Sequence, residues 1–234
     1  MEMKTLRLAG VMRESIVDGP GIRMTVFGQG CPHHCKGCHN PETHDPEGGY
    51  ISHPENILKA IGENPLLQGV TFSGGEPFFQ AEAFAELGAE IKKRGLHIVT
   101  YSGYTFEQIM SGIEAGKPGW KELLSVTDML VDGKFVLEEK SLNLLFRGSK
   151  NQRLINVPKS LEEGKAVLWN PEEESGVLRV SFRKEIRKVH AVCSFGNLCF
   201  RGARYSGFEK RNNSFGKRSL RIFDETYRKN PSSV

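Results

Sequence analysis

The sequence lacks the features of a membrane-spanning or exported protein. None of its apolar runs approaches the roughly 20 residues that a transmembrane helix needs. Its first seven residues, MEMKTLR, contain neither the apolar core nor the cleavage site of a signal peptide. With 38% hydrophobic and 26% charged residues among 234, the composition is that of a soluble globular protein with room for one substantial domain. We therefore expect a cytoplasmic protein with no membrane partner.

Cysteine is also scarce: the chain has five, and three of them fall within eight residues as C-x3-C-x2-C. So dense a group as Cys31, Cys35 and Cys38 fits a reducing compartment better than a disulfide framework. No fourth cysteine follows at the spacing of a zinc finger, and structural zinc prefers four protein ligands. A 4Fe–4S cluster held by three thiolates keeps one iron open for a substrate. The spacing predicts such a cluster, with structural zinc or unrelated free thiols as the alternatives.

Positive charge is concentrated at one end of the chain. Residues 1–174 hold 18 Lys and Arg against 24 Asp and Glu, a net charge of −6, whereas residues 175–234 hold 14 against 4, a net charge of +10. The change predicts a domain of residues 1–174 and a basic C-terminal extension of residues 175–234. Apart from one strand-like segment at 177–182, the extension lacks an apolar period, so we expect it to be partly disordered. Its charge could attract the acidic domain, an acidic partner or nucleic acid, but nothing in it resembles a nucleic-acid-binding fold. Its two cysteines, Cys193 and Cys199, fall short of the four ligands of a second cluster.

Turn-forming and apolar segments alternate along the first domain in the manner of an α/β protein. We expect strands at residues 22–27, 69–72, 96–100 and 129–131, helices at 54–61, 81–94 and 105–113, and further short strands at 153–157 and 166–169. Ser52 and Thr105 are candidate helix caps. Strands that alternate with helices favour a parallel sheet, and the chain is too short for a complete eightfold barrel of about 250 residues. The expected fold is an open, partial β/α barrel.

Two glycine-containing motifs follow two of the expected strands. The cysteine loop, residues 30–41, begins after the strand at 22–27, and SGGEP, residues 73–77, follows the strand at 69–72. Sheets of this class bind ligands at the carboxyl ends of their strands. Gly74 and Gly75 would let the backbone approach such a ligand closely. The two motifs therefore belong to one predicted site.

These motifs resemble the radical S-adenosylmethionine (radical SAM) superfamily. More narrowly, VDGPGIR at residues 17–23 and CHNP at residues 38–41 resemble the activases of glycyl radical enzymes. The resemblance covers roughly residues 6–158. It departs from the common pattern at Gly37, where many radical SAM enzymes carry an aromatic residue, and the basic extension has no counterpart in it.

Three further stretches narrow the resemblance. YSGYT at residues 101–105, LVDGKFV at 130–136 and FRGSKNQR at 146–153 are similar to the activating proteins of anaerobic ribonucleoside-triphosphate reductase. The activases of pyruvate formate-lyase share the VDGPGIR, CHNP and SGGEP stretches, so a role as such an activase is the first alternative. A zinc- or nucleic-acid-binding module, with the loop as a metal knuckle and the extension as a basic arm, is the alternative from another class.

The resemblance implies two cofactors, one 4Fe–4S cluster per chain and S-adenosylmethionine. The residues implied as cluster ligands and catalytic centre are Cys31, Cys35 and Cys38. The residues implied as cofactor-binding are Gly37, Cys38, His39, Gly74, Gly75 and Glu76. S-adenosylmethionine would chelate the fourth iron with its amino and carboxylate groups, and the backbone of Gly74 and Gly75 would bind that amino group.

The resemblance also implies a reaction. One electron from the reduced cluster would cleave S-adenosylmethionine into methionine and a 5′-deoxyadenosyl radical. This radical would take a hydrogen atom from the Cα of a glycine, and the implied partner is anaerobic ribonucleoside-triphosphate reductase. A flavodoxin or ferredoxin would supply the electron.

For several polar residues, the sequence permits either a structural or surface role or a role in the predicted site. Glu76 could cap a helix or orient the cysteine loop. We expect His33 and His34 to be solvated loop residues, and His39 to meet the cofactor through its backbone. A further set could form either a surface charge pattern or the face that docks the reductase, and we favour the docking face: Asp132, Lys134, Arg147 and Asn151.

Overall fold

The computed structural model of the chain describes residues 3–171. The strands are β1 (Leu6–Ser15), β2 (Arg23–Gly28), β3 (Tyr50–Ser52), β4 (Gly69–Gly74), β5 (His97–Tyr101), β6 (Met129–Asp132) and β7 (Arg153–Asn156). The α-helices are α1 (Pro54–Gly62), α2 (Ala81–Lys93), α3 (Phe106–Glu114), α4 (Trp120–Val126) and α5 (Val157–Glu163). Three short 3-10 helices are η1 (Pro41–Thr43), η2 (Pro77–Gln80) and η3 (Leu137–Glu139). The predictions for residues 175–234, including the strand at 177–182 and the two cysteines there, lie outside the described residues.

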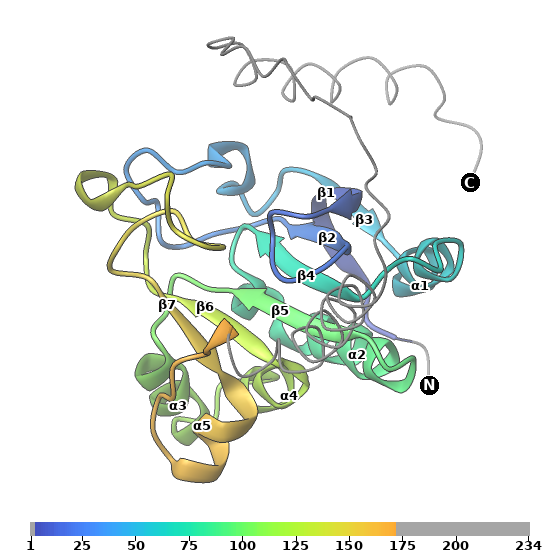
Figure 1. Ribbon diagram of the computed structural model, residues 1–234. Coiled ribbons are helices and arrows are strands. Elements are labelled where there is room, and N and C mark those ends of the chain that lie inside the picture. The colour runs from blue at the N-terminus through green and yellow to red at the C-terminus, as the bar shows by residue number, and fades with distance from the viewer. Residues whose placement is uncertain (1–2, 172–234) are drawn as a thin grey trace, which may run out of the picture. The chain divides into compact units, whose positions relative to one another are not determined.

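The strands form one seven-stranded sheet in the order β3-β1-β2-β4-β5-β6-β7 (Figure 1). The central strands β2, β4, β5 and β6 are parallel, whereas the outer strands pair antiparallel with their neighbours. Because β3 and β7 form its two edges, the sheet does not close into a full barrel. The expected α/β class with an open sheet is confirmed.

The predicted elements within the parallel core are confirmed, with ends that shift by one or two residues. Thr105 caps α3 as expected and forms a capping box with Gln108. Ser52 does not cap α1: it pairs with Leu6 in the sheet, and His53 precedes the helix instead. The predicted strand at 166–169 is reduced to one bridge, between Leu168 and Ile155.

Two strands, β1 and β3, and two α-helices, α4 and α5, were not predicted, nor were the three 3-10 helices. β1 carried a short local signal, because Leu6 and Leu8 lie on either side of Arg7 and are both fully buried. β3, α4 and α5 are only three to seven residues long, too short for a period to be recognised.

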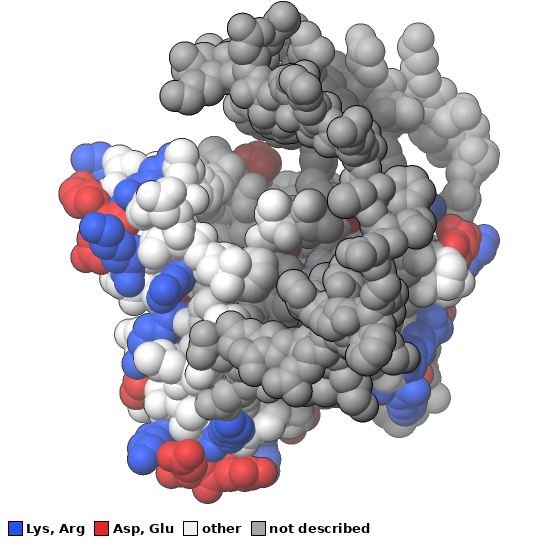
Figure 2. Space-filling model, in the orientation of Figure 1, with Lys and Arg blue, Asp and Glu red and all other residues white. Residues whose placement is uncertain are grey.

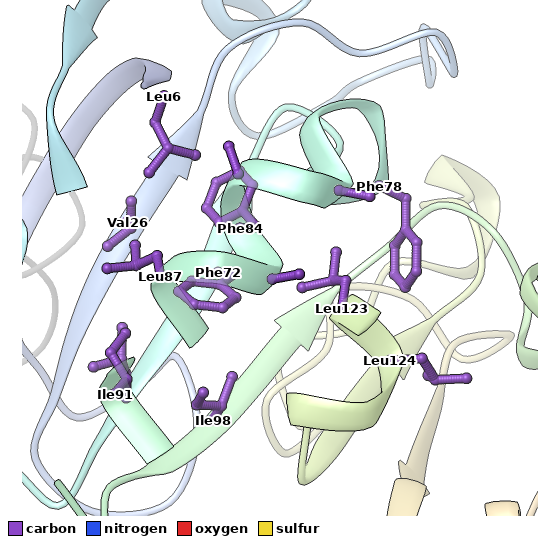
Figure 3. Packing of buried hydrophobic residues seen from close by; sticks show 14 of the residues in the cluster. Leu6, Val26, Phe72, Phe78, Phe84, Leu87, Ile91, Ile98, Leu123 and Leu124 are labelled. Atoms are coloured by element: carbon purple, nitrogen blue, oxygen red, sulfur yellow. The ribbon is translucent and has the colours of Figure 1, made fainter. Parts of the chain in front are cut away.

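Helices cover one face of the sheet and build the main core there (Figure 3). Val26, Phe72 and Ile98 lie on this face of β2, β4 and β5, and all three are fully buried. Helix α2 packs Phe84 and its other apolar residues onto them, with the Phe72 and Phe84 rings 4.9 Å apart. This packing fixes the positions of the parallel strands and therefore the positions of their carboxyl ends.

The opposite face of the sheet carries the charged residues of the VDGPGIR stretch, of which Arg23 is buried and Asp18 half-buried. The Arg23 guanidinium, fully buried, donates hydrogen bonds to Thr71 Oγ1 and to the carbonyl oxygens of Pro20, Val70 and His97, at 2.8–2.9 Å. Asp18 accepts hydrogen bonds from the hydroxyl groups of Ser15 and Thr25. These contacts satisfy the buried polar groups and fold residues 16–22 back over the sheet.

Within residues 3–171, none of the helices has the length and apolar character needed to cross a membrane. On the face drawn in Figure 2, the basic and acidic side chains of the described residues are interspersed.

Candidate active site

The carboxyl ends of the parallel strands bring the two predicted motifs together. The cysteine loop leaves β2, and the SGGEP segment leaves β4, its parallel neighbour. The N–H of Gly75 donates to the Gly28 carbonyl at 2.8 Å, and the N–H of Glu76 donates to the Gly30 carbonyl at 2.9 Å. The start of the cysteine loop is thus hydrogen-bonded directly to the glycine turn.

Buried hydrogen bonds hold the base of the cysteine loop. The side-chain amide of Gln29, 2% exposed, donates to the carbonyl oxygens of Glu42 and Asp45. The N–H of Gly30 donates to the Thr43 carbonyl at 2.8 Å, and that of Cys31 donates to the His44 carbonyl at 3.2 Å. The two ends of the loop are therefore closed on each other.

The three cysteines are half-buried free thiols. Burial raises the pKa of Cys31 and of Cys38, and the negative charge of a Cys35 thiolate raises both further. Backbone N–H groups act in the opposite direction: those of His33 and His34 lower the pKa of Cys31, and that of Asn40, which lies 3.4 Å from the Cys38 sulfur, lowers the pKa of Cys38. At Cys38 a backbone donor is therefore already in place for the charged form.

Gly74 and Gly75 occupy positions where a side chain does not fit. Gly74 has φ +91°, and a Cβ there would lie 2.7 Å from backbone atoms of Gly28 and Phe27. A Cβ on Gly75 would lie 2.4 Å from the Gly30 carbonyl oxygen. The N–H groups of Gly75 and Glu76 are already bonded to the carbonyl oxygens of Gly28 and Gly30. An amino group is a donor, so the backbone groups of this turn that could bind it are carbonyl oxygens.

Glu76 is buried and fully engaged with the protein. Its carboxylate, 1% exposed, accepts hydrogen bonds from the Phe78 N–H, the Ser102 hydroxyl, the Gly103 N–H and the His33 imidazole. The bond from Phe78 caps η2, as one interpretation of the sequence proposed. The other three tie the cysteine loop and the end of β5 to the end of β4, so both predicted roles of Glu76 are present.

His33 is not the solvated loop residue that we expected. Its side chain is 5% exposed, and Nε2 lies 2.8 Å from Glu76 Oε2. The Tyr104 ring packs edge-on against it at 4.4 Å between centroids. His34 is exposed, in agreement with the prediction, and contacts the ring of His44. The tertiary contact that buries His33 leaves no local signal in the sequence.

A second segment, residues 133–152, lies against the cysteine loop. The His39 ring is 4.9 Å from the Phe135 ring, and Leu137 packs on Gly37. Partial burial and the nearby Lys140 lower the pKa of His39. Figure 1 shows these two segments on the same side of the sheet, at the carboxyl ends of the parallel strands.

Internal hydrogen bonds fold this second segment into one unit. The Gln152 side chain accepts hydrogen bonds from the N–H groups of Gly148 and Ser149 and donates to the Gly133 carbonyl. The Asn151 side chain donates to the Lys134 carbonyl at 2.8 Å. The LVDGKFV and FRGSKNQR stretches are therefore neighbours in space as well as in the resemblance.

Asp132 does not belong to an exposed docking face. It is 1% exposed, accepts the N–H of Phe106 at the start of α3, and forms a two-point ion pair with Arg153. Lys134 and Asn151 are exposed, and Arg147 is half-buried with a bond to the Gln152 carbonyl. Asp132 is therefore not part of the predicted docking face. It instead connects β6 to β7 and to the start of α3.

Three buried side-chain nitrogens have no hydrogen-bond partner within residues 3–171: Nε2 of His44, Nε of Arg147 and Nε1 of Trp169. The ring of Phe146, the neighbour of Arg147 in the sequence, lies 6.3 Å from that of Trp169. In the same part of the chain, no three His, Cys, Asp or Glu side chains converge closely enough to hold a single metal ion. In an iron–sulfur cluster each thiolate instead binds its own iron.

A family described as "4Fe-4S single cluster domain" matches residues 17–155, a span that contains both motifs. The chain belongs to this family. Its relatives identify it more narrowly as a radical SAM activase of glycyl radical enzymes. An iron–sulfur cluster and S-adenosylmethionine are accordingly its cofactors. The interpretation of the loop as a zinc knuckle of a binding module is not supported.

Two kinds of relatives are similar to this 4Fe–4S domain protein at 34% identity. One is the anaerobic ribonucleoside-triphosphate reductase-activating protein, found in Vibrio cholerae over 58% of this chain and 89% of that protein. The counterpart in Enterobacteria phage T4 matches over 59% and 86%. The other is the pyruvate formate-lyase 1-activating enzyme of Escherichia coli K12, matched over 65% of this chain and 61% of that enzyme.

Proposed function

We propose that this radical SAM activase generates the glycyl radical of anaerobic ribonucleoside-triphosphate reductase. The observation that carries the proposal is the extent of the matches: the chain spans nearly all of the reductase-activating relatives, but 61% of the longer lyase-activating enzyme. The unit formed by residues 133–152 supports it, since both of its stretches resemble the reductase-activating group. Activation of pyruvate formate-lyase is the second candidate, favoured by the equal identity of 34%.

We further propose that Cys31, Cys35 and Cys38 hold the cluster. Their partial burial, their place in one short loop and the backbone N–H donor at the Cys38 sulfur support this assignment. When bound, the cluster and S-adenosylmethionine supply a one-electron cleavage that yields a carbon radical able to remove hydrogen from a glycine Cα.

The remaining site residues would position the second cofactor. Carbonyl oxygens of the Gly74–Gly75 turn would accept hydrogen bonds from the methionine amino group. Gly37 and His39 would lie against the cofactor, held there by Leu137 and Phe135. Glu76 would act mainly on the protein, because its carboxylate already accepts hydrogen bonds from four donors.

A small one-electron carrier, a flavodoxin or a ferredoxin, would supply the electron that reduces the cluster. This donor follows from the resemblance of the chain to the activase group. It can be tested by replacing dithionite with either reduced carrier in a cofactor-cleavage assay.

The first experiment is anaerobic purification with iron and sulfide analysis, followed by electron paramagnetic resonance of the dithionite-reduced protein. About four irons per chain and a reduced-cluster signal that changes when S-adenosylmethionine is added are expected. The protein is then incubated with anaerobic ribonucleoside-triphosphate reductase and, in parallel, with pyruvate formate-lyase. A glycyl radical signal in the reductase supports the proposal; a signal in the lyase alone replaces it with the second candidate.

A further inference from the structure

The Glu76 carboxylate, just after β4, joins the cysteine loop to the end of β5. The His33 imidazole reaches it from the cysteine loop, at 2.8 Å from Nε2 to Oε2. The Ser102 hydroxyl and the Gly103 N–H reach it from the end of β5, the latter at 2.8 Å. His33 is the contact by which the cysteine loop itself enters this buried network.

The space around the His33 ring is closed. Tyr104 packs edge-on against one side of the ring, at 4.4 Å between centroids. On another side, a Cβ on Gly103 would lie 2.3 Å from His33 Cδ2. The absence of a side chain at position 103 therefore makes the room that the imidazole needs to reach Glu76.

His33 lies two residues after the first cysteine, Cys31, and two before the second, Cys35. Its side chain is 5% exposed and is held by Glu76, so the stretch between these two cysteines is anchored to the protein interior. Burial of this one side chain therefore restricts the movement of the loop that carries the thiols.

We propose that His33 is a positioning residue that locks the cysteine loop, and with it Cys31 and Cys35, to the ends of β4 and β5. The inference rests on the assignment of these cysteines to the cluster under the proposed function. Release of the His33 side chain frees the loop that carries the thiols, so iron becomes easier to remove. It also leaves the Glu76 carboxylate with one donor fewer, and the less neutralised negative charge near the cluster disfavours the more negative, reduced state and lowers the reduction potential.

The test compares His33→Asn with His34→Asn in the reconstituted holoenzyme. The asparagine side chain is too short to reach Glu76 from position 33. The side chain of His34, in contrast, is exposed and forms none of the hydrogen bonds to Glu76, and its φ of +47° is one that asparagine tolerates. The two measurements are the midpoint potential of the cluster, by a redox titration followed by electron paramagnetic resonance, and the rate of iron release to a chelator. We expect a more negative potential and faster release in His33→Asn, and wild-type values in His34→Asn.

Two further variants make the comparison independent of one substitution. His33→Gln places an amide N–H near the position of Nε2 and should restore both quantities toward wild type. Gly103→Ala should reproduce the effect of His33→Asn, because the new methyl displaces the imidazole, and should add little in the His33→Asn background. Gly62→Ala is the control, since a Cβ there meets only Arg94 Nη1, at an ordinary 3.6 Å. If His33→Asn fails to fold, Gly103→Ala against Gly62→Ala supplies the same comparison.

The outcomes separate this inference from the proposed function. A wild-type protein that binds no cluster would remove the proposed function and this inference with it. If the wild type binds the cluster but His33→Asn and His34→Asn share its potential and release rate, the inference alone is overturned. Equal losses in both variants also overturn it, because the effect would then belong to the loop in general.

Discussion

Leu137 covers Gly37: a Cβ on Gly37 would lie 2.9 Å from Leu137 Cδ1. Gly37 also has φ +73°, in the left-handed region that favours glycine. The position therefore excludes a side chain for two reasons, steric and conformational. Leu137, from the second segment, occupies the space that a side chain at position 37 would need.

Gly37→Ala should destabilise the protein by about 1 kcal/mol or more and lower the cluster content, because the loop must shift between two of its cysteines. Urea unfolding and iron analysis measure both effects. Adding Leu137→Ala to this variant should remove the part of the destabilisation that comes from the steric clash and leave the part that comes from the positive φ. Full stability and iron content in Gly37→Ala would contradict the geometry.

Cys35→Ala should abolish the brown cluster and all cleavage of S-adenosylmethionine, since two thiolates cannot hold the cluster. Absorption spectra and a cleavage assay after anaerobic reconstitution test this. Cys193→Ala is the matched control and should retain both properties. Cleavage that survives in Cys35→Ala would show that the site assignment is wrong.

Gly75→Ala should impair both cofactors. From the sequence alone we expect a side chain here to leave the cluster intact and to weaken S-adenosylmethionine binding. The structure adds a clash, because the Cβ would lie 2.4 Å from the carbonyl oxygen of Gly30, the residue before the first cysteine. Iron analysis and calorimetric titration of S-adenosylmethionine separate the two effects. Unchanged iron content would favour the expectation from the sequence, in which only S-adenosylmethionine binding is weakened.

Asp132→Asn should cost roughly 3 kcal/mol of unfolding free energy, because it removes the buried negative partner of Arg153. Glu107 provides a matched control, since it pairs with the same guanidinium but its side chain is 59% exposed. Hydrogen bonds from Arg153 lower the pKa of Glu107 to about 2. Even so, Glu107→Gln should cost less than about 1 kcal/mol, because solvent screens the pair. Urea denaturation measures the loss of unfolding free energy in each variant. Equal losses would contradict the expectation that the buried carboxylate contributes more than the exposed one.

Truncation after Glu174 should leave cleavage of S-adenosylmethionine intact. This prediction comes from the charge boundary and from the match of 145 residues that spans 89% of the Vibrio cholerae relative. A cleavage assay on the shortened and full-length chains tests it. Lost cleavage in a folded, iron-loaded truncation would place the basic extension in the catalytic domain.

Much of the fold could be predicted because its signals are local. The strands β2, β4, β5 and β6 are short apolar runs that end in turn-forming residues, and the capping box of α3 lies within four residues. Periodicity does not reveal elements as short as β3 or α4, and it does not give the order of strands in the sheet.

The three-cysteine spacing, the glycine turn and the order of the motifs can be read from the amino-acid sequence, and they were enough to indicate the class of chemistry. The surroundings of His33, Glu76 and Asp132 arise only when the chain folds. Glu76 bonds to His33 across 43 residues and to Ser102 across 26, and Asp132 bonds to Arg153 across 21. Such contacts exist because the carboxyl ends of parallel strands lie side by side even when the strands are far apart in the sequence. A buried polar group there bonds to whichever partner the packing brings within reach.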